Sequence, residues 1–387
     1  QLIPLPPSIW HALPGREITV AIDRALGLSD LWRPISLTPA ESWNSLLAMT
    51  VPLAAVLVAS RLCAEDVARL MQALVAIAVA SALLGLLQIT SGNGSSAYLY
   101  RITNEGSMVG FFANRNHHAV FQACAIIFSA TLLRDELMRR RQNIMIQLGY
   151  AGAAMLCTLM TILIGSRAGL VAGGLAFAVG YAMFLPAWRS GPVASRPPDT
   201  GASSLSSQWL VYVPPILLAA LLTTVLFLAD RTTALDRVAE NRVAEDLRVL
   251  AWPSVRQMIE TYWVAGSGFG SFPSVYRIFE ADALLQPAYF NHAHNDWAEI
   301  LVTGGLPFAL IIASGLIWFG AAVVRIGFQR LVKGYRGDYR LPLLATVGLL
   351  AAASAVDYPL RTPSLQVMAV ILLVTFVCPK PATAQRE

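Results

Sequence analysis

Long runs of apolar residues recur along almost the whole chain, and they restrict its fold more than any other feature. A helix needs about 20 apolar residues to cross the hydrocarbon core of a bilayer. The runs that reach or approach this length are 43–60, 68–90, 118–133, 145–164, 168–185, 210–228, 300–324, 341–356 and 365–378. The sequence therefore predicts an all-α integral membrane protein, a multi-helix bundle with about nine spanning helices.

The overall composition agrees with a membrane protein. Of the 387 residues, 56% are hydrophobic and only 13% are charged, whereas soluble domains carry about 25% charged residues. None of the four cysteines pairs with another in a CxxC spacing, so neither a disulfide framework nor a zinc ribbon is indicated. The net charge of +5 suits an anionic partner, although basic loops also arise from membrane topology alone. We expect membrane lipid around the chain and no nucleic-acid partner.

Basic residues are spread unevenly over the predicted loops. The loops near 61–69, 134–142, 188–208 and 325–340, with the C-terminal tail, hold more than half of the Lys and Arg residues in the smaller share of the loop sequence. By the positive-inside rule these loops should be cytoplasmic, so the other set faces the periplasm. Every basic residue on the predicted periplasmic side is Arg, whose planar fork suits pyrophosphate. A GC-rich genome would equally explain the shortage of Lys.

This topology divides the chain into four successive segments. We expect a periplasmic N-terminal segment at 1–41 with one short helix, six transmembrane helices in 42–228, a large periplasmic loop at 229–299, and three further helices with a cytoplasmic tail in 300–387. In the loop, 231–260 reads as a helix, and the glycines of 266–270 end it as a hinge or a close-packing turn. Because the chain begins with Gln1 rather than Met, we expect earlier helices to be missing.

A dense group of polar residues lies directly before the apolar run 300–324, at 290–299 (FNHAHNDWAE). Polar groups beside a bilayer are costly unless they line a wet cavity or take part in chemistry. His294 could act as a general base, because an ordinary imidazole pKa near 6.5 allows proton transfer near neutrality, and Glu299 or Asp296 could orient its ring. A simpler interpretation is a helix N-cap at Asn295 or Asp296 with Glu299 in a capping box. That interpretation explains the Asn and the acids but not two histidines.

A zinc site is a further interpretation of the same histidines. His292 and His294 could bind zinc together with His117 and His118. The spacing is not that of a helical HExxH pair, and the group contains no Cys ligand. Acid–base chemistry is therefore favoured.

Arginines lie at other predicted helix ends on the same side of the membrane. Arg167 occupies a short turn between two spans, where it either reaches the lipid headgroups or binds an anion beside a helix N-terminus. Arg248 lies among acidic residues, so surface ion pairing is its default role. Arg115 and Asn116 precede the run 118–133, and Arg361 lies between two prolines in the last outer turn. Such convergence of Arg and His indicates a common site.

These motifs together resemble the O-antigen ligase-related superfamily, which contains O-antigen ligases and the repeat-unit polymerases of bacterial surface polysaccharides. The likeness rests on FFANRNH at 111–117, GSRAG at 165–169, an Arg and Trp at 248 and 252 before the glycines of 266–270, HAHN at 292–295 before two glycines at 304–305, and DYPLR at 357–361. The motifs occur in this order between about 110 and 363.

The resemblance implies a membrane-embedded glycosyltransferase of the GT-C-like type in the bacterial inner membrane, with its active face in the periplasm. It implies an undecaprenyl-pyrophosphate-linked glycan donor, a glycan or lipid A-core acceptor, and inverting transfer that needs no metal and no cofactor. His294 matches the family's essential His, and Arg167 and Arg248 match its pyrophosphate-binding arginines. The expected site comprises catalytic His294, substrate-binding Arg167, Arg248, Arg361 and Arg115, and supporting Asn295, Asn116 and Glu299.

Two alternatives stay open at the level of the sequence. The ligase pattern HNx9GxxG fits His294, Asn295 and Gly305, but its last Gly falls on Phe308, which favours a polymerase over a ligase. The other alternative is a flippase for the same lipid-linked sugar. A transporter should have polar or broken helices at mid-membrane, whereas the runs here read as apolar throughout, with polar residues gathered on one face.

Overall fold

The computed structural model describes residues 1–139, 141–190, 234–285, 290–326 and 338–377, with side chains left aside at 186–190 and 234–247. These residues form two compact units. Unit 1 comprises Gln1–Val56, Ala239–Gly327 and Ser354–Pro363, and unit 2 comprises Leu57–Val238, Phe328–Ala353 and Ser364–Glu387. Each unit therefore interleaves distant pieces of sequence. This is a different kind of division from the four predicted topological segments, which stay a prediction.

Helices occupy every predicted span within the described residues, and only 210–228 lies outside them. The helices are α3 (Pro39–Ala48), α4 (Thr50–Ala59), α5 (Ala64–Ser91), α6 (Arg115–Leu137), α7 (Ile144–Leu163), α8 (Arg167–Ser190), α13 (Asp296–Ile326), α15 (Arg340–Ala353) and α16 (Pro363–Val377). In this part of the chain, five segments are long and apolar enough to cross a membrane: α3 with α4, α5, α7, α8 and α13. The prediction of a helical membrane protein is confirmed.

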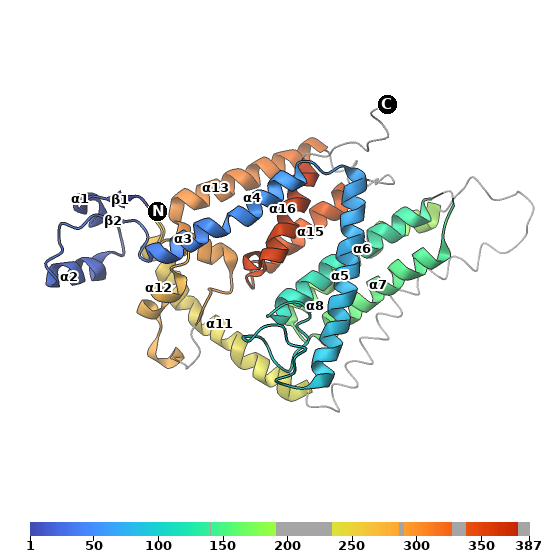
Figure 1. The fold of residues 1–387 in the computed structure, drawn as a ribbon, viewed down its shortest axis with the longest axis horizontal. Coiled ribbons are helices and arrows are strands. Elements are labelled where there is room, and N and C mark those ends of the chain that lie inside the picture. Colours follow the sequence, from blue (N-terminus) through green and yellow to red (C-terminus); the bar gives the residue numbers. More distant parts are fainter. Residues whose placement is uncertain (140, 191–233, 286–289, 327–337, 378–387) are drawn as a thin grey trace, which may run out of the picture. The chain divides into compact units, whose positions relative to one another are not determined.

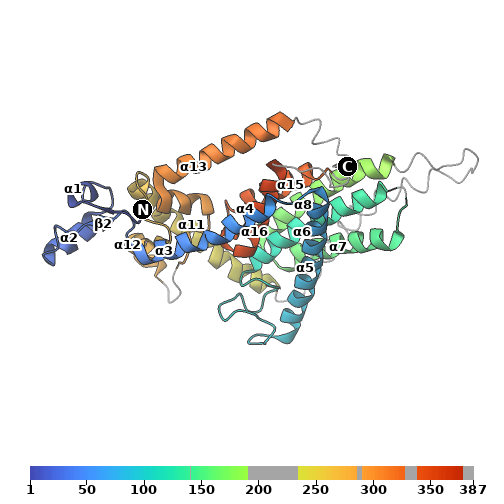
Figure 2. The same cartoon turned by 45° about the horizontal axis from the view of Figure 1, so that its top comes forward.

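In unit 2, α6 packs against α5, α7 and α8, and it contains more polar residues than the sequence analysis predicted. Every side chain from His117 to Leu132 is buried, because α7 and α8 pack along it (Figures 1 and 2). Its buried polar residues include Gln122, Ser129 and Arg134, and α6 is not among the five candidate spans. The expectation that the helices are apolar throughout is therefore wrong for α6. Protein rather than lipid surrounds its polar groups, which makes them tolerable.

Small residues bring α6 and α8 together. A Cβ added to Gly169 would lie 2.4 Å from Cβ of Ala119, and one added to Gly180 would lie 2.9 Å from Cβ of Ala130. The two contacts are separated by the same interval on both helices, about three turns. The helices consequently run parallel, and their N-termini lie at the same end of unit 2. Close approach through small residues is the usual packing of membrane helices.

The core of unit 1 joins α11 (Ala234–Tyr262), α12 (Phe272–Phe279) and the first turns of α13. One face of α11 contributes Ala251, Val255, Met258 and Tyr262 at helical spacing, and these pack against Phe272, Val275, Tyr276, Ala298 and Val302. The predicted loop helix at 231–260 is thus confirmed over the described residues. Its packing fixes the start of α13, where the polar group at 290–299 lies.

The N-terminal segment has more structure than the one short helix expected. It contains β1 (Pro4–Leu5), α1 (Pro7–Trp10), α2 (Glu17–Ala25) and β2 (Arg33–Pro34), with β1 and β2 antiparallel. Figure 2 shows these elements as a small lobe on the side of α12 within unit 1. Buried Arg16 joins the lobe to the rest of unit 1, because its guanidinium donates to the backbone carbonyls of Ile35 and Gly266 at 2.7 and 2.8 Å.

A break divides α13 into two helical pieces. Gly305 has φ 61° and ψ −163°, which only glycine adopts readily. Pro307 has no N–H, so the carbonyl of Thr303 loses its usual partner within the helix. The N–H of Leu306 donates to Trp263 at 2.6 Å instead of to the carbonyl of Val302. Two helical carbonyls are therefore free to bond outside the helix.

The glycine-rich turn at 266–270 takes up both carbonyls. Ser267 N donates to the carbonyl of Val302 at 2.9 Å, and Gly268 N donates to that of Thr303 at 3.0 Å. A Cβ on Gly266 would lie only 2.3 Å from the Thr303 oxygen. Of the two roles predicted for these glycines, the structure shows the close-packing turn. The break in α13 serves this packing, in contrast to transporter helices, whose breaks line a binding cavity.

Candidate active site

The polar group at 290–299 begins α13 through a side-chain cap. Asn295 Oδ1 accepts a hydrogen bond from Ala298 N at 3.0 Å, and the Asn295 carbonyl accepts from Glu299 N at 3.0 Å. The N-cap interpretation is therefore correct for Asn295 and wrong for Asp296. Glu299 also lies outside a capping box, because its Oε2 accepts from Ala293 N at 2.9 Å, beyond the cap residue. Capping accounts for one residue of the group and leaves both histidines unexplained.

His294 has an unusual backbone conformation. Its φ of 49° makes it the single residue other than glycine with a positive φ among those the structure describes. Left-handed backbone at such a residue costs of order 1–3 kcal/mol, and it persists only where the surroundings impose it. Phe290 and Tyr358 hold the imidazole, with ring centroids 5.1 and 5.0 Å away. The fold thus places this ring at an energetic cost, as is common at functional sites.

A buried carboxylate orients the His294 ring, and it is not one of those predicted. His294 Nδ1 lies 3.3 Å from Oδ1 of Asp357, which is 2% exposed. The prediction that Glu299 or Asp296 orients this ring is therefore wrong. An Nδ1–H held by a carboxylate places the lone pair on Nε2, which forms no hydrogen bond within the described part of the chain. The arrangement supplies a fixed proton acceptor in a side chain that is 16% exposed.

The electrostatic surroundings keep this imidazole neutral. Burial is the largest influence and lowers the pKa of His294 below its ordinary value of 6.5. The charge of Arg248 lowers the pKa further, whereas the hydrogen bond and the charge of Asp357 raise it. At neutral pH the side chain is therefore unprotonated and able to accept a proton.

Arg248 lies on the other side of the same carboxylate. Its Nη2 is 3.9 Å from Oδ2 of Asp357, and its Nη1 donates to the carbonyl of Val356 at 3.4 Å. Both contacts are long, and the side chain is 26% exposed. The guanidinium is therefore held loosely beside the His294–Asp357 pair, with hydrogen-bonding capacity left for an anion.

Arg361 has a different environment, although the sequence grouped it with Arg248. Its Nε lies 3.1 Å from Oδ1 of Asp296, and its Nη1 lies 3.2 Å from Oε1 of Glu299. Glu299 in turn lies 3.2 Å from Nδ1 of His292. Both carboxylates are nearly inaccessible, at 6% and 3% side-chain exposure. The charge of Arg361 is thus balanced within the protein, as expected of a structural ion pair.

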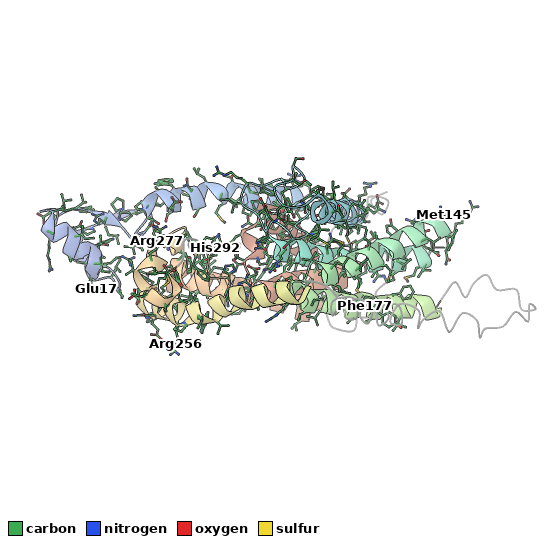
Figure 3. The ribbon with its side chains drawn as sticks, turned by 90° about the horizontal axis from the view of Figure 1, so that it is seen from below. Glu17, Met145, Phe177, Arg256, Arg277 and His292 are labelled. Atoms are coloured by element: carbon green, nitrogen blue, oxygen red, sulfur yellow. The ribbon has the colours of Figure 1, made fainter. Side chains whose placement is uncertain are left out.

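Figure 3 shows His292 within unit 1, together with Arg277. His292 is the more exposed of the two histidines, with 27% of its side chain accessible. Its ring lies 4.5 Å from the Tyr358 ring, so both imidazoles contact the same phenol. Asp357 and Tyr358 are the residues that the sequence interpretation missed. They belong to the DYPLR motif, from which the sequence interpretation selected only Arg361 and assigned no role to Asp357.

The other predicted site residues, Arg115, Asn116 and Arg167, lie in unit 2. They are found at the N-terminal ends of α6 and α8. Asn114 caps α6 by accepting from Asn116 N at 2.8 Å, and Arg115 is the first residue of that helix. Ser166 caps α8 by accepting from Gly169 N at 3.0 Å, which makes exposed Arg167 its first residue. Both arginines therefore extend from helix N-termini, where the helix dipole and free N–H groups favour anions.

The histidines predicted as zinc ligands are divided between the two units. His292 and His294 lie in unit 1, and His117 and His118 lie in unit 2. Among the described residues, no three His, Cys, Asp or Glu side chains are grouped so that they could hold a metal ion.

Comparison with known proteins identifies one family. Residues 152–313 match the family model described as O-antigen ligase, which confirms the resemblance to the O-antigen ligase-related superfamily. The matched stretch contains Arg167, Arg248 and His294, whereas Asp357 and Arg361 lie beyond it. No curated protein and no solved structure matched the chain.

Proposed function

Because residues 152–313 carry the O-antigen ligase family region, we propose that this protein transfers a glycan from undecaprenyl pyrophosphate to a sugar hydroxyl at the periplasmic face of the inner membrane. It acts as a repeat-unit polymerase or as an O-antigen ligase with a lipid A-core acceptor. The proposal rests mainly on the contacts of Asp357 with His294 on one side and with Arg248 on the other. Together these residues provide a neutral base, its orienting carboxylate and an available cation.

The reaction follows from these groups. The acceptor hydroxyl oxygen attacks the anomeric carbon as its proton passes to Nε2 of His294, and the bond from that carbon to the pyrophosphate oxygen breaks. Asp357 holds the Nδ1–H and stabilises the imidazolium that forms, a role carboxylates have beside catalytic histidines. One displacement of this kind inverts the configuration of the sugar. The lipid pyrophosphate departs with the bonding electron pair.

Arginine stabilises the charge that grows on the departing pyrophosphate. Arg248, Arg167 and Arg115 are the proposed pyrophosphate-binding residues, with Asn116 in a supporting role. Guanidinium groups aimed at developing charge can provide several kcal/mol of transition-state stabilisation, so the mechanism needs no metal. Arg361 is left out of this set, because Asp296 and Glu299 already balance its charge.

The central test is complementation of a strain from which the full-length gene is deleted. Wild-type protein should restore surface glycan on a gel, and His294→Ala should not, although it reaches the membrane in equal amount. In the deletion strain, lipid A-core without polymer together with accumulated undecaprenyl-linked polymer identifies a ligase, whereas single repeat units alone identify a polymerase. Full complementation by His294→Ala would show that the proposal is wrong.

Metal dependence is tested on purified protein in liposomes. The transfer rate should be unchanged by EDTA and by zinc, because arginines carry out the charge stabilisation. If EDTA stopped transfer and zinc restored it, the proposed mechanism would be incorrect.

A further inference from the structure

Unit 1 contains a second imidazole–carboxylate pair that the proposed mechanism does not use. His292 Nδ1 lies 3.2 Å from Oε1 of Glu299, much as His294 Nδ1 lies 3.3 Å from Oδ1 of Asp357. Both rings contact Tyr358. The two pairs therefore flank one phenol ring and share one geometry, with each Nδ1 directed at a carboxylate and each Nε2 left to act as an acceptor.

The charges around the two pairs differ. Glu299 is balanced by Arg361 at 3.2 Å and accepts a backbone hydrogen bond from Ala293 at 2.9 Å. Asp357 likewise accepts a backbone hydrogen bond, from Tyr358 N at 3.0 Å, but its contact with Arg248 is longer, at 3.9 Å. The 3.2 Å contact with Arg361 fixes Glu299 in place, and Glu299 in turn orients the His292 ring through Nδ1.

Exposure and neighbours indicate the kind of group that His292 meets. Its side chain is 27% exposed, compared with 16% for His294, and half-buried Tyr358 lies beside it. A hydrogen-bond acceptor next to an aromatic face suits a polyol with an apolar ring surface. Arg361, the arginine that contacts Glu299, is already paired with two carboxylates and is therefore poorly suited to bind the donor pyrophosphate.

We propose that His292, held by Glu299 and beside Tyr358, is the acceptor-sugar subsite. Nε2 of His292 accepts a hydrogen bond from a second hydroxyl of the acceptor sugar, which positions the reacting hydroxyl at His294. This inference rests on the proposed function and specifies the ligand of one part of its site: a sugar that presents at least two hydroxyls. This hydrogen bond forms when the acceptor sugar binds and breaks when the product leaves, and His292 forms no covalent bond.

The test compares the Michaelis constants of the two substrates in liposomes that contain the full chain. The donor is undecaprenyl-linked glycan extracted from wild-type membranes. The acceptor is lipid A-core or undecaprenyl-linked single repeat unit from the deletion strain, whichever the wild-type protein uses. His292→Ala should raise the KM for the acceptor about fivefold to tenfold, the effect of one neutral hydrogen bond. The KM for the donor should stay within twofold of the wild-type value.

Two further variants separate this role from a structural one. In His292→Gln, the amide oxygen can replace Nε2 as an acceptor, so the acceptor KM should recover part of the loss. His11→Ala, in the N-terminal lobe, is the matched control and should leave both constants unchanged. If His292→Ala does not fold, the Gln variant decides alone, because an acceptor KM raised by more than twofold with an unchanged donor KM still meets the prediction.

The outcomes distinguish this inference from the proposed function. An acceptor KM within twofold of wild type in every folded His292 variant overturns the subsite, as does an equal rise in both Michaelis constants. Neither result affects the role of His294. Full transfer by His294→Ala would instead overturn the proposed function, and the acceptor subsite with it.

Discussion

His294 and His118 occupy similar places in the sequence, yet their environments are opposite. Each lies among Asn and His residues at the start of a helix. His118 is fully buried in unit 2, with Nδ1 2.8 Å from the carbonyl of Met108 and Nε2 2.9 Å from the Gln122 amide. Both of its ring nitrogens are therefore occupied. His294 has one nitrogen on Asp357 and the other available to a substrate.

The comparison shows that the motif alone does not distinguish a fully enclosed histidine from one with an available ring nitrogen. A Cβ added to Gly110 would lie 2.8 Å from Nε2 of His118, and one added to Gly85 would lie 3.1 Å from its Cε1. Two glycines thus make room for a ring that is enclosed on every side. His294 instead has a costly backbone conformation and a partly open ring. The difference predicts opposite consequences when each side chain is removed.

The largest expected effect is on activity at His294. His294→Ala should lower the transfer rate by roughly a hundredfold to ten-thousandfold, the usual contribution of a positioned general base. His294→Asn is the matched control, because Asn tolerates a positive φ but provides no base. Rates are measured in liposomes and folding by thermal unfolding in detergent. Equal loss in both variants without loss of folding supports the base, and a wild-type rate in either contradicts it.

For His118 we expect the opposite result, a loss of stability with little loss of activity. His118→Ala should lower the free energy of unfolding, because the Met108 carbonyl and the Gln122 amide then lose a partner at about 1–3 kcal/mol each. Its transfer rate per folded molecule should remain near that of wild type. Thermal unfolding and rate normalised to folded protein measure the two effects. If His118→Ala had normal stability but no activity, the prediction that His118 has a structural role would be wrong.

The next largest effect on activity is expected at two of the arginines proposed to bind pyrophosphate. Arg167→Ala and Arg248→Ala should each lower the transfer rate by roughly a hundredfold to a thousandfold, because each removes a group that stabilises developing charge. Arg256→Ala is a control, since that side chain is exposed and paired with Glu260 on the same helix as Arg248. Wild-type rates in both Arg167 and Arg248 variants would exclude their role in binding pyrophosphate.

Asp357→Asn tests the orientation of the base. The variant keeps the shape but loses the charge that favours an Nδ1–H and stabilises the imidazolium, so we expect a loss of roughly a hundredfold or less. Asp23→Asn, in the N-terminal lobe, alters a comparably buried ion pair with Arg33 and serves as the control. A rate unchanged in Asp357→Asn would show that another group orients His294.

The smallest effect is the dependence of the rate on pH. The pKa of His294 lies below its ordinary value, mainly through burial. The rate should therefore be constant near neutrality and fall only as the pH drops through this lowered pKa, where protonation removes the Nε2 lone pair. In Arg248→Met the midpoint should move upward, because a positive charge that disfavours the imidazolium is gone. A rate versus pH profile measures both.

Local sequence features predicted the helices and identified His294 as a candidate site residue. Apolar runs defined the spans, and the dense polar group led to His294. The carboxylate partner was assigned wrongly because Asp296 and Glu299 are close in sequence, whereas Asp357 reaches His294 only through the tertiary fold. The break in α13 was also missed, although Gly305 and Pro307 are visible signals. The break they cause depends on the turn at 266–270, which bonds the freed carbonyls of α13, and the local sequence around Gly305 does not indicate that contact.

The interleaving of unit 1 has a consequence for biogenesis. His294 comes from the second of its three pieces and Asp357 from the third. During synthesis His294 is therefore made before Asp357, and the two can pair only once the third piece has been synthesised. A nascent or prematurely terminated chain that ends before Ser354 contains the whole family-matched stretch and still lacks an oriented base.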